Sequence, residues 1–573
     1  MQSPVDRLPL ELVDEILKRL PIAAHDQLDH PRGTGDTSVH HAVLASCARV
    51  SRLFHVSAVR VLWRDQHLGW ICRAIFRDFI RRNVSRSDRL EARLAAVGLD
   101  DDSEEEGNDT AHGAYSTFPD AQYGYLPRPI SAEEWARFEH YAPHVHVLRY
   151  TRDETIDSSF FLLLQQYARR QPLFPNLHEL IWEHATPELV SVVSPSIRII
   201  RLPEDEENEE YAAEAQVNVF HMRRHVFKAL LPTVLKGVPS LEVLKTRTLG
   251  RETFWSPLRA PSGECLLSQS IRVLHISESF TTLTRVALVI ISSLQRLVEL
   301  SIKCSGRGPK HNLGMGAALD LSDVRPFNRL ERLRIKGFGI EVTALIEAIV
   351  APVLEDVGIG VYTEHHQNQT RAGLALGVAL DTLRRRNADT LWRLHLDVRS
   401  WPVPFFPTTT EPTFAPIARP LLDLRHLRYV SIFNGGRADV SVPALVAAWP
   451  DLRTLIMPAQ EPSPDMLTAI AHTCTKLESL SFDSLAKEFL DLPPVAAENP
   501  AASTDSDVAI PALRELRLIE RLFTRDSPDA KHENITRFLR SLFPRLVVEQ
   551  KLVGADPVPY TDMSLAWYYE DNL

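Results

Sequence analysis

The sequence has 573 residues, of which 44% are hydrophobic and 24% are charged, and its net charge is −10. These values are ordinary for a globular protein and give no reason to expect nucleic acid as a partner. The five cysteines are odd in number and include no close pair, which argues against a disulfide framework and against a cysteine-rich zinc site.

The start of the chain carries acidic side chains where a secretory signal would be basic and then apolar. The longest apolar runs, such as residues 286–294, fall well short of the roughly 18 residues that span a bilayer. We therefore expect a soluble protein of the cytoplasm or nucleus, with no membrane partner.

Residues 6–21, DRLPLELVDEILKRLP, predict a short amphipathic helix that begins near Pro9 and ends at Pro21. Its apolar residues recur at helical spacing and form one stripe. Residues 42–65 predict two further short helices, each with an apolar stripe of its own. Three such helices cannot bury all of this surface among themselves, so the remainder indicates contact with another protein.

The block LPLELVDEILKRLP followed by LASCARVSRLFHVSAVRVLWRD resembles an F-box, and residues 1–70 would form its three-helix domain. The resemblance implies docking on the Skp-type adaptor of a cullin–RING ubiquitin ligase and, through the adaptor, on a cullin. It places these residues near the adaptor: Leu8, Pro9, Leu12, Ile16, Leu20, Pro21, Val50, Leu62 and Trp63. The loop of residues 22–41 is longer than in a compact F-box. The alternative is that these helices only cap the rest of the chain.

Residues 71–170 are poorly patterned and predict a linker or helical region. Residues 99–113 within it form an acidic insert of a composition typical of disorder. The basic amphipathic segment RAIFRDFIRR, residues 73–82, is interpreted as a helix that extends the F-box, rather than as a contact with membrane or nucleic acid.

A short pattern of apolar residues recurs along residues 171–550 and predicts a strand at each copy. Segments between the copies, such as residues 340–352 and 373–386, have helical spacing. A strand and a helix repeated in this way predict an α/β solenoid in which neighbouring units cover each other. The copies begin at residues 177, 197, 241, 271, 297, 330, 354, 391, 427, 452, 477 and 513. Residues 551–573 are expected to be a C-terminal tail.

The solenoid resembles the irregular leucine-rich repeats that follow many F-boxes, including those of a large fungal group. In such strands the residues between the apolar positions face the concave surface. Basic residues concentrate there in the middle strands, which predicts recognition of an acidic or phosphorylated target segment. The candidate substrate-facing residues are Lys303, Arg332, Arg334, Lys336, Arg393 and His395. The alternative is a solvated face that neighbouring Asp and Glu neutralise.

Signatures of catalysis are missing: the sequence has no GxSxG elbow and no phosphate-binding loop. The pairs His144 with His146 and His365 with His366 lack further ligands at metal-binding spacing, and are interpreted as surface histidines. We therefore expect no enzyme activity and no cofactor. The sequence favours a substrate-recognition subunit of a Skp–cullin–F-box ubiquitin ligase that holds a target protein on its solenoid. The alternative is a protein-binding scaffold unconnected to ubiquitination.

Overall fold

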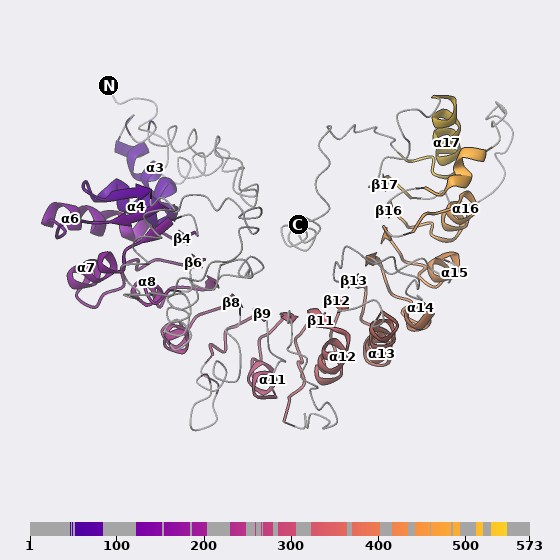
Figure 1. Cartoon of the computed structure of the whole chain (residues 1–573), viewed down its shortest axis with the longest axis horizontal. Helices are drawn as coiled ribbons and strands as arrows, with labels where there is room; N and C mark the ends of the chain where they lie inside the picture. The colour runs from indigo at the N-terminus through magenta and orange to yellow at the C-terminus, as the bar shows by residue number, and fades with distance from the viewer. Residues whose placement is uncertain are drawn as a thin grey trace, which may run out of the picture. The chain divides into compact units, whose positions relative to one another are not determined.

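The structure is a computed structural model. It describes Ser46, Arg49 and residues 52–83, 122–151, 154–183, 186–202, 230–247, 258, 265, 267–278, 285–304, 323–363, 369–400, 415–433, 442–458, 460–482, 485–492, 512–518 and 529–546. The chain divides into two compact units, with the boundary between Thr246 and Arg247. Each unit is an α/β structure built on parallel strands (Figure 1).

The first unit contains five parallel strands in the order β1-β4-β6-β7-β8 and a separate small sheet in the order β2-β3-β5. Its strands are β1 (Asp65–His67), β2 (Ile80–Asn83), β3 (Gln122–Tyr125), β4 (Val147–Tyr150), β5 (Glu154–Ile156), β6 (Glu179–Trp182), β7 (Ile199–Arg201) and β8 (Val243–Arg247). Its described helices are α3 (Arg52–Arg64), α4 (Leu68–Ile75), α6 (Ala132–Tyr141), the 3-10 turn η2 (Ala142–His144), α7 (Ser158–Ala168) and α8 (Leu189–Val192).

The second unit runs through consecutive parallel strands from β9 to β17. These are β9 (Val273–Glu278), β10 (Glu299–Cys304), β11 (Arg332–Phe338), β12 (Asp356–Thr363), β13 (Arg393–Ser400), β14 (Tyr429–Phe433), β15 (Thr454–Ile456), β16 (Ser479–Phe482) and β17 (Glu515–Leu518). The helices are α11 (Arg285–Ser292), α12 (Gly339–Ala348), α13 (Gln369–Asn387), α14 (Ala415–Leu422), α15 (Val442–Ala447), α16 (Pro464–Thr473), the 3-10 turn η7 (Lys487–Asp491) and α17 (Asp529–Leu542).

Within the second unit the helices lie on one side of the strands (Figure 1). The core sits between these two layers. On β10, for example, Leu300 and Ile302 are buried, whereas Glu299, Ser301 and Lys303 are half-buried. Because side chains alternate across a strand, the second set points to the side that the helices leave uncovered. We call this side of the second unit the open face.

The repeat pattern placed the strands correctly. Each of the twelve copies coincides with one strand, from β6 through β17, and the helical spacing of residues 340–352 and 373–386 coincides with α12 and α13. The predicted α/β solenoid is confirmed in this respect. Among the described residues, no helix combines the length and apolar character needed to cross a lipid bilayer.

The parallel sheet begins earlier than the sequence indicated. Strands β1 and β4 pair with each other, and β4 pairs with β6, so residues 147–150 belong to the sheet, while α6 and α7 lie in the region expected to be a linker or helical. The segment at residues 73–82 is not a continuous helix either, because α4 ends at Ile75 and strand β2 begins at Ile80. The acidic insert at residues 99–113 and the tail at residues 551–573 lie outside the described residues.

Candidate interaction surface

Strands β10 to β13 bring all six candidate substrate-facing residues onto the open face. The register is continuous, so side chains at matching positions of the four strands form rows across the sheet. The first row is Glu299, Arg332, Asp356 and Arg393, the second is Ser301, Arg334, Gly358 and His395, and the third is Lys303, Lys336, Gly360 and Asp397.

Arg334 is locked in a two-point ion pair. Its Nη1 and Nη2 donate to Oδ1 and Oδ2 of Asp356 at 2.6 and 2.7 Å. The Asp356 side chain is 6% exposed and that of Arg334 is 20% exposed, so solvent weakens this pair little. The predicted availability of Arg334 for an acidic ligand is therefore wrong, because the chain supplies the carboxylate itself.

Glu299 pairs with two basic residues, one on each neighbouring strand. Its Oε2 lies 3.0 Å from Arg332 Nη2, and its Oε1 lies 2.7 Å from His275 Nε2 on β9. Burial would raise the pKa of Glu299, but the hydrogen bond and charge of His275, together with Arg332, outweigh it and lower that pKa. Half of the Arg332 side chain remains exposed, so it still presents positive charge beside its carboxylate partner.

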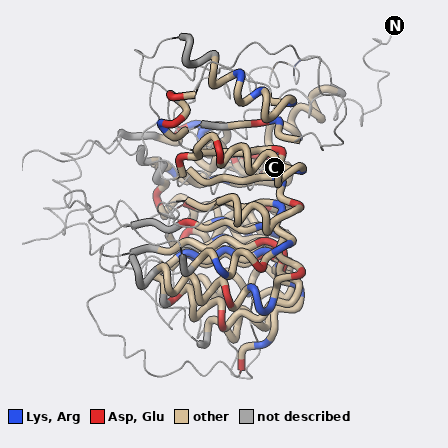
Figure 2. Tube along the Cα trace, turned by 90° about the vertical axis from the view of Figure 1, so that its right-hand side faces the viewer, with Lys and Arg blue, Asp and Glu red and all other residues tan. Residues whose placement is uncertain are grey.

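The open face is consequently of mixed charge rather than uniformly basic, because Asp356 neutralises Arg334 while Arg332 stays half exposed beside Glu299. Figure 2 shows the two signs of charge interspersed along the described chain instead of separated into large areas. Arg393 lies over the ring of Tyr429 on β14, with its guanidinium carbon 4.3 Å from the ring centroid, a cation–π contact. His395 packs against Phe433 with ring centroids 5.4 Å apart.

Two glycines leave two of the outward positions of β12 without side chains. A Cβ built on Gly360 would lie 2.7 Å from Cγ of Lys336, so the alkyl chain of Lys336 rests directly on the backbone of β12. Gly358 stands opposite Arg334 in the register. The absence of side chains at Gly358 and Gly360 gives the long side chains of β11 room on the neighbouring strand.

Charge pairing of the same kind recurs in the first unit. Asp65 on β1 receives both guanidinium hydrogen bonds of Arg149 on β4, at 2.9 and 3.0 Å. Glu179 on β6 pairs with Arg201 on β7 at 2.9 Å. The carboxylate and the guanidinium stand two residues apart in register in both pairs. Ordered ion pairs between adjacent strands are thus a general feature of this sheet.

Of the expected adaptor-binding residues, Leu8, Pro9, Leu12, Ile16, Leu20, Pro21 and Val50 lie outside the described residues. Leu62 is half-buried on α3. Trp63 is only 5% exposed, stacks on Tyr141 with ring centroids 4.3 Å apart and meets Trp70 edge-on at 5.1 Å. The expectation that Trp63 presents its ring to an adaptor is therefore wrong, since the ring is part of the chain's own core.

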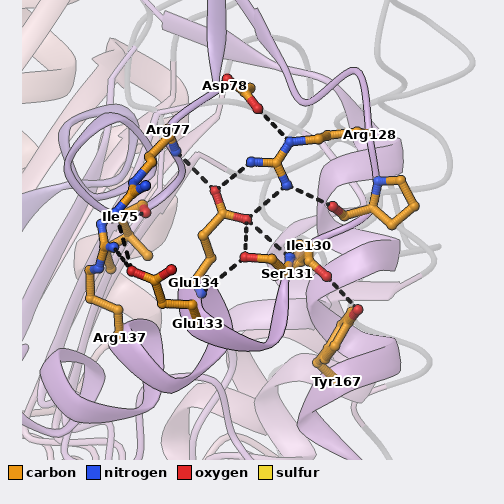
Figure 3. Close-up of polar contacts among 11 residues, drawn as sticks. Ile75, Arg77, Asp78, Arg128, Ile130, Ser131, Glu133, Glu134, Arg137 and Tyr167 are labelled. Atoms are coloured by element: carbon orange, nitrogen blue, oxygen red, sulfur yellow. Dashed lines mark hydrogen bonds and ion pairs between the residues drawn. The ribbon is translucent and has the colours of Figure 1, made fainter.

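A buried carboxylate fixes the loops beside this core (Figure 3). Glu134 on α6 accepts hydrogen bonds from Arg128, at 2.9 and 3.0 Å, from the backbone N–H of Arg77 at 3.0 Å, and from Ser131. Burial would raise the pKa of Glu134, but these donors outweigh it and lower the pKa to about 2. Every partner lies within the first unit, which makes the cluster a structural junction between α4 and α6.

Strand β4 was not predicted, although its residues contain the repeat pattern. Val145, Leu148 and Tyr150 have the same apolar spacing as the other copies, and all three are buried around β4. Strand β1 had no such signal, because buried Gln66 occupies the corresponding position. The Gln66 side-chain amide donates to the carbonyl of Leu62, which satisfies it within the core.

The histidines considered as metal ligands do not form a metal centre in the described part of the chain. No group of three or more His, Cys, Asp or Glu is arranged there to hold a metal ion. His144 lies in η2, His146 directly precedes β4, and His365 and His366 lie outside the described residues. His146 instead contacts His178, the residue that precedes β6, with their Nδ1 atoms 3.3 Å apart.

Comparison with known proteins gives no family assignment. No family model matches the chain, and no curated protein matches it. Among solved structures, an internalin from Listeria monocytogenes is similar at 12% identity and a TM-score of 0.30, over 63% of this chain and 80% of the internalin. A TLR13–ssRNA13 complex is similar at 13% identity and a TM-score of 0.28, over 71% of this chain and 52% of that one, so the match spans about half of its length. Both TM-scores are low, and neither likeness defines the function of this chain.

Proposed function

We propose that this chain is a non-enzymatic scaffold that binds a protein partner on the open face of strands β10 to β13. The observation that carries the proposal is the in-register array of charged side chains on a face without helices. Ion pairs such as Arg334 with Asp356 hold these side chains in place before any partner arrives. A preordered surface loses little conformational entropy on binding, which favours recognition of a folded protein or an extended segment.

Mixed charge sets the expected character of the partner. On this face Arg332 lies beside Glu299, and Arg334 lies beside Asp356. Such a surface binds most favourably a partner that carries complementary charges of both signs. A uniformly acidic or phosphorylated segment would have to compete with the chain's own carboxylates. We therefore favour a protein partner of mixed charge over the phosphorylated segment predicted from sequence.

The proposal is tested by proximity labelling with the full-length chain, comparing the wild type with a Lys303→Glu/Arg332→Glu variant. Lys303 is half-buried and Arg332 is half-exposed, so both changes alter the open face without leaving a fully buried charge unpaired. The matched control is Arg385→Glu on the helix side, where 60% of the side chain is exposed. Loss of the same labelled proteins in the double variant alone is expected; equal loss in both variants, or in neither, contradicts the proposal.

A more specific role is a substrate receptor of a cullin–RING ubiquitin ligase in the cytoplasm or nucleus. It rests on the F-box resemblance of the N-terminal blocks, whose last helix, α3, leads directly into the sheet at β1. Because α3 packs into the first unit through residues such as Ala58 and Trp63, a fragment of residues 1–70 is not a suitable probe. The full chain is the appropriate reagent.

This role is tested by co-purification of the Skp-type adaptor with the full-length chain. Leu12→Asp combined with Ile16→Asp is expected to abolish co-purification, because the resemblance places these residues against the adaptor. Val56→Asp on α3, where the side chain is 43% exposed, is a control for general changes in surface charge. Failure of the wild-type chain to retain the adaptor would leave the scaffold without a ligase role.

A further inference from the structure

Two arginines and two histidines occupy equivalent places in the first unit. Each lies directly before a strand, at the edge of the sheet where the parallel strands begin. His146 N–H donates to the carbonyl of Arg64, His178 N–H to that of His146, and Arg198 N–H to that of His178, each at 2.8 Å. Since adjacent strands lie about 4.8 Å apart, these bonds set Arg64, His146, His178 and Arg198 at regular intervals. We call these four residues the edge row.

The side chains at the centre of the edge row are ordered. The Nδ1 atoms of His146 and His178 are 3.3 Å apart, and their ring centroids are 5.1 Å apart. His178 Nδ1 also lies 2.6 Å from the carbonyl oxygen of Asn176, whose side-chain amide donates to the carbonyl of Pro143 at 2.8 Å. His178 is exposed and His146 is half-buried, so the pair is held in position while remaining open to solvent.

The surroundings add positive charge. Arg60 on α3, His140 on α6 and His144 in η2 act electrostatically on this region. Burial, followed by the neighbouring His178 and Arg64, lowers the pKa of His146. Burial, His140 and Arg60 likewise lower the pKa of His144. Burial and like-charged neighbours therefore disfavour the imidazolium forms of His144 and His146.

Of the carboxylates close to the edge row, one pairs with a member of the row and two are engaged by other arginines. Glu242 pairs with Arg198, at 3.4 Å and at a largely exposed position, while Asp65 and Glu179 are bound by Arg149 and Arg201. Within the described ranges, no carboxylate forms an ion pair with the other three members of the row. Arg64, His146 and His178 therefore lack a paired carboxylate among the described residues, and such a group of basic side chains is suited to an anionic ligand from outside the chain.

We propose that the edge row binds a short acidic peptide segment of a protein partner, with its carboxylates meeting Arg64, His146, His178 and Arg198. A short segment fits because the chain as a whole has a net charge of −10 and would repel a long polyanion such as nucleic acid. Two histidines without a third ligand do not favour a metal ion. This surface is separate from the open face, and the proposal does not depend on that function.

Binding at this site is linked to protonation. A carboxylate beside His146 favours its imidazolium form, so binding raises the pKa of this ring and takes up a proton. By linkage, affinity increases as the pH falls through the range in which this imidazole titrates. This dependence distinguishes the edge row from an arginine cluster, whose charge is constant over that range.

The test is fluorescence anisotropy of labelled octa-aspartate with the full-length chain at about pH 7.5 and about pH 5.5, at one low ionic strength. Aspartate side chains stay ionised at both values, so the change reports the histidines. We expect about tenfold tighter binding at the lower pH. The double variant His146→Gln/His178→Gln is expected to abolish this gain. His178→Lys, which carries a constant charge, is expected to raise affinity at the higher pH and flatten the dependence.

The matched control is Arg453→Gln, which changes an equivalent edge position before β15 that is already paired with Glu478. It should leave octa-aspartate affinity unchanged, and circular dichroism should show that every variant keeps the wild-type fold. Absence of octa-aspartate binding, an affinity independent of pH, or an equal loss in Arg453→Gln would overturn the proposal. Tighter binding of a single-stranded oligonucleotide through the same residues would assign the row to nucleic acid and would also overturn it.

Discussion

Arg334 on β11 binds the carboxylate of Asp356 on β12 diagonally across the sheet. The residue directly opposite Arg334 in the register is Gly358, and Asp356 stands opposite Arg332. Without a side chain at Gly358, nothing on β12 blocks the guanidinium of Arg334 from both oxygens of Asp356. The charge pattern of the open face is therefore set by pairs between strands and not by the sequence of any one strand.

Removing the guanidinium of Arg334 should destabilise the protein strongly. Arg334→Ala leaves Asp356, 6% exposed, as a buried and unpaired carboxylate, and we expect a loss of about 3 kcal/mol in the free energy of unfolding. Arg334→Ala/Asp356→Ala should recover much of that loss. Urea denaturation of the two variants measures it, and a double variant no more stable than the single one would show that the pair is not the cause.

The contact of Lys336 with the β12 backbone predicts a coupling between Lys336 and Gly360. Gly360→Ala places a Cβ against the Lys336 alkyl chain, and we expect a loss of about 1 kcal/mol. In a Lys336→Ala background the same change should be neutral or stabilising, because the collision is gone and alanine restricts the unfolded chain. A double-mutant cycle of unfolding free energies measures this coupling; additive effects would mean that Lys336 can move away freely.

The lowered pKa of Glu134 predicts that the free energy of unfolding depends on pH in the acidic range. Its pKa is about 2 in the folded chain against 4.5 as the ordinary value, so its contribution is fully present above about pH 4.5. That contribution is lost progressively as the pH falls toward 2, where the folded state also takes up the proton. We expect the stability difference between wild type and Glu134→Gln to shrink over this interval. Glu133→Gln, at a side chain that is 70% exposed, is the control and should show little change.

Trp63 should matter for folding more than for partner binding. Trp63→Ala removes a buried ring that stacks on Tyr141, and we expect a loss of about 3–5 kcal/mol. Trp63→Phe retains an aromatic ring and should lose less. Thermal denaturation gives the stability, and co-purification of the Skp-type adaptor gives the binding. A stable Trp63→Phe variant that no longer co-purifies with the adaptor would indicate that Trp63 contacts the adaptor directly.

The sequence specified where the strands and helices lie. Each copy of the apolar pattern became a strand because the spacing places three side chains on one face, where only a covering helix removes them from water. The same spacing was present at Val145, Leu148 and Tyr150, so β4 was also predictable. Strand β1 was not predictable, because Gln66 is polar and joins the core only through its bond to Leu62.

What the chain determined by itself was thus the order of its elements and the face of each strand that is buried, since both follow from local apolar spacing. What tertiary structure alone decided was the chemistry of the surfaces. Arg334 meets Asp356 and His146 meets His178 only because strand register joins residues 22 and 32 positions apart. Charge neutralisation depends on the distance in space between opposite charges. The number of basic residues along one strand does not reveal that distance.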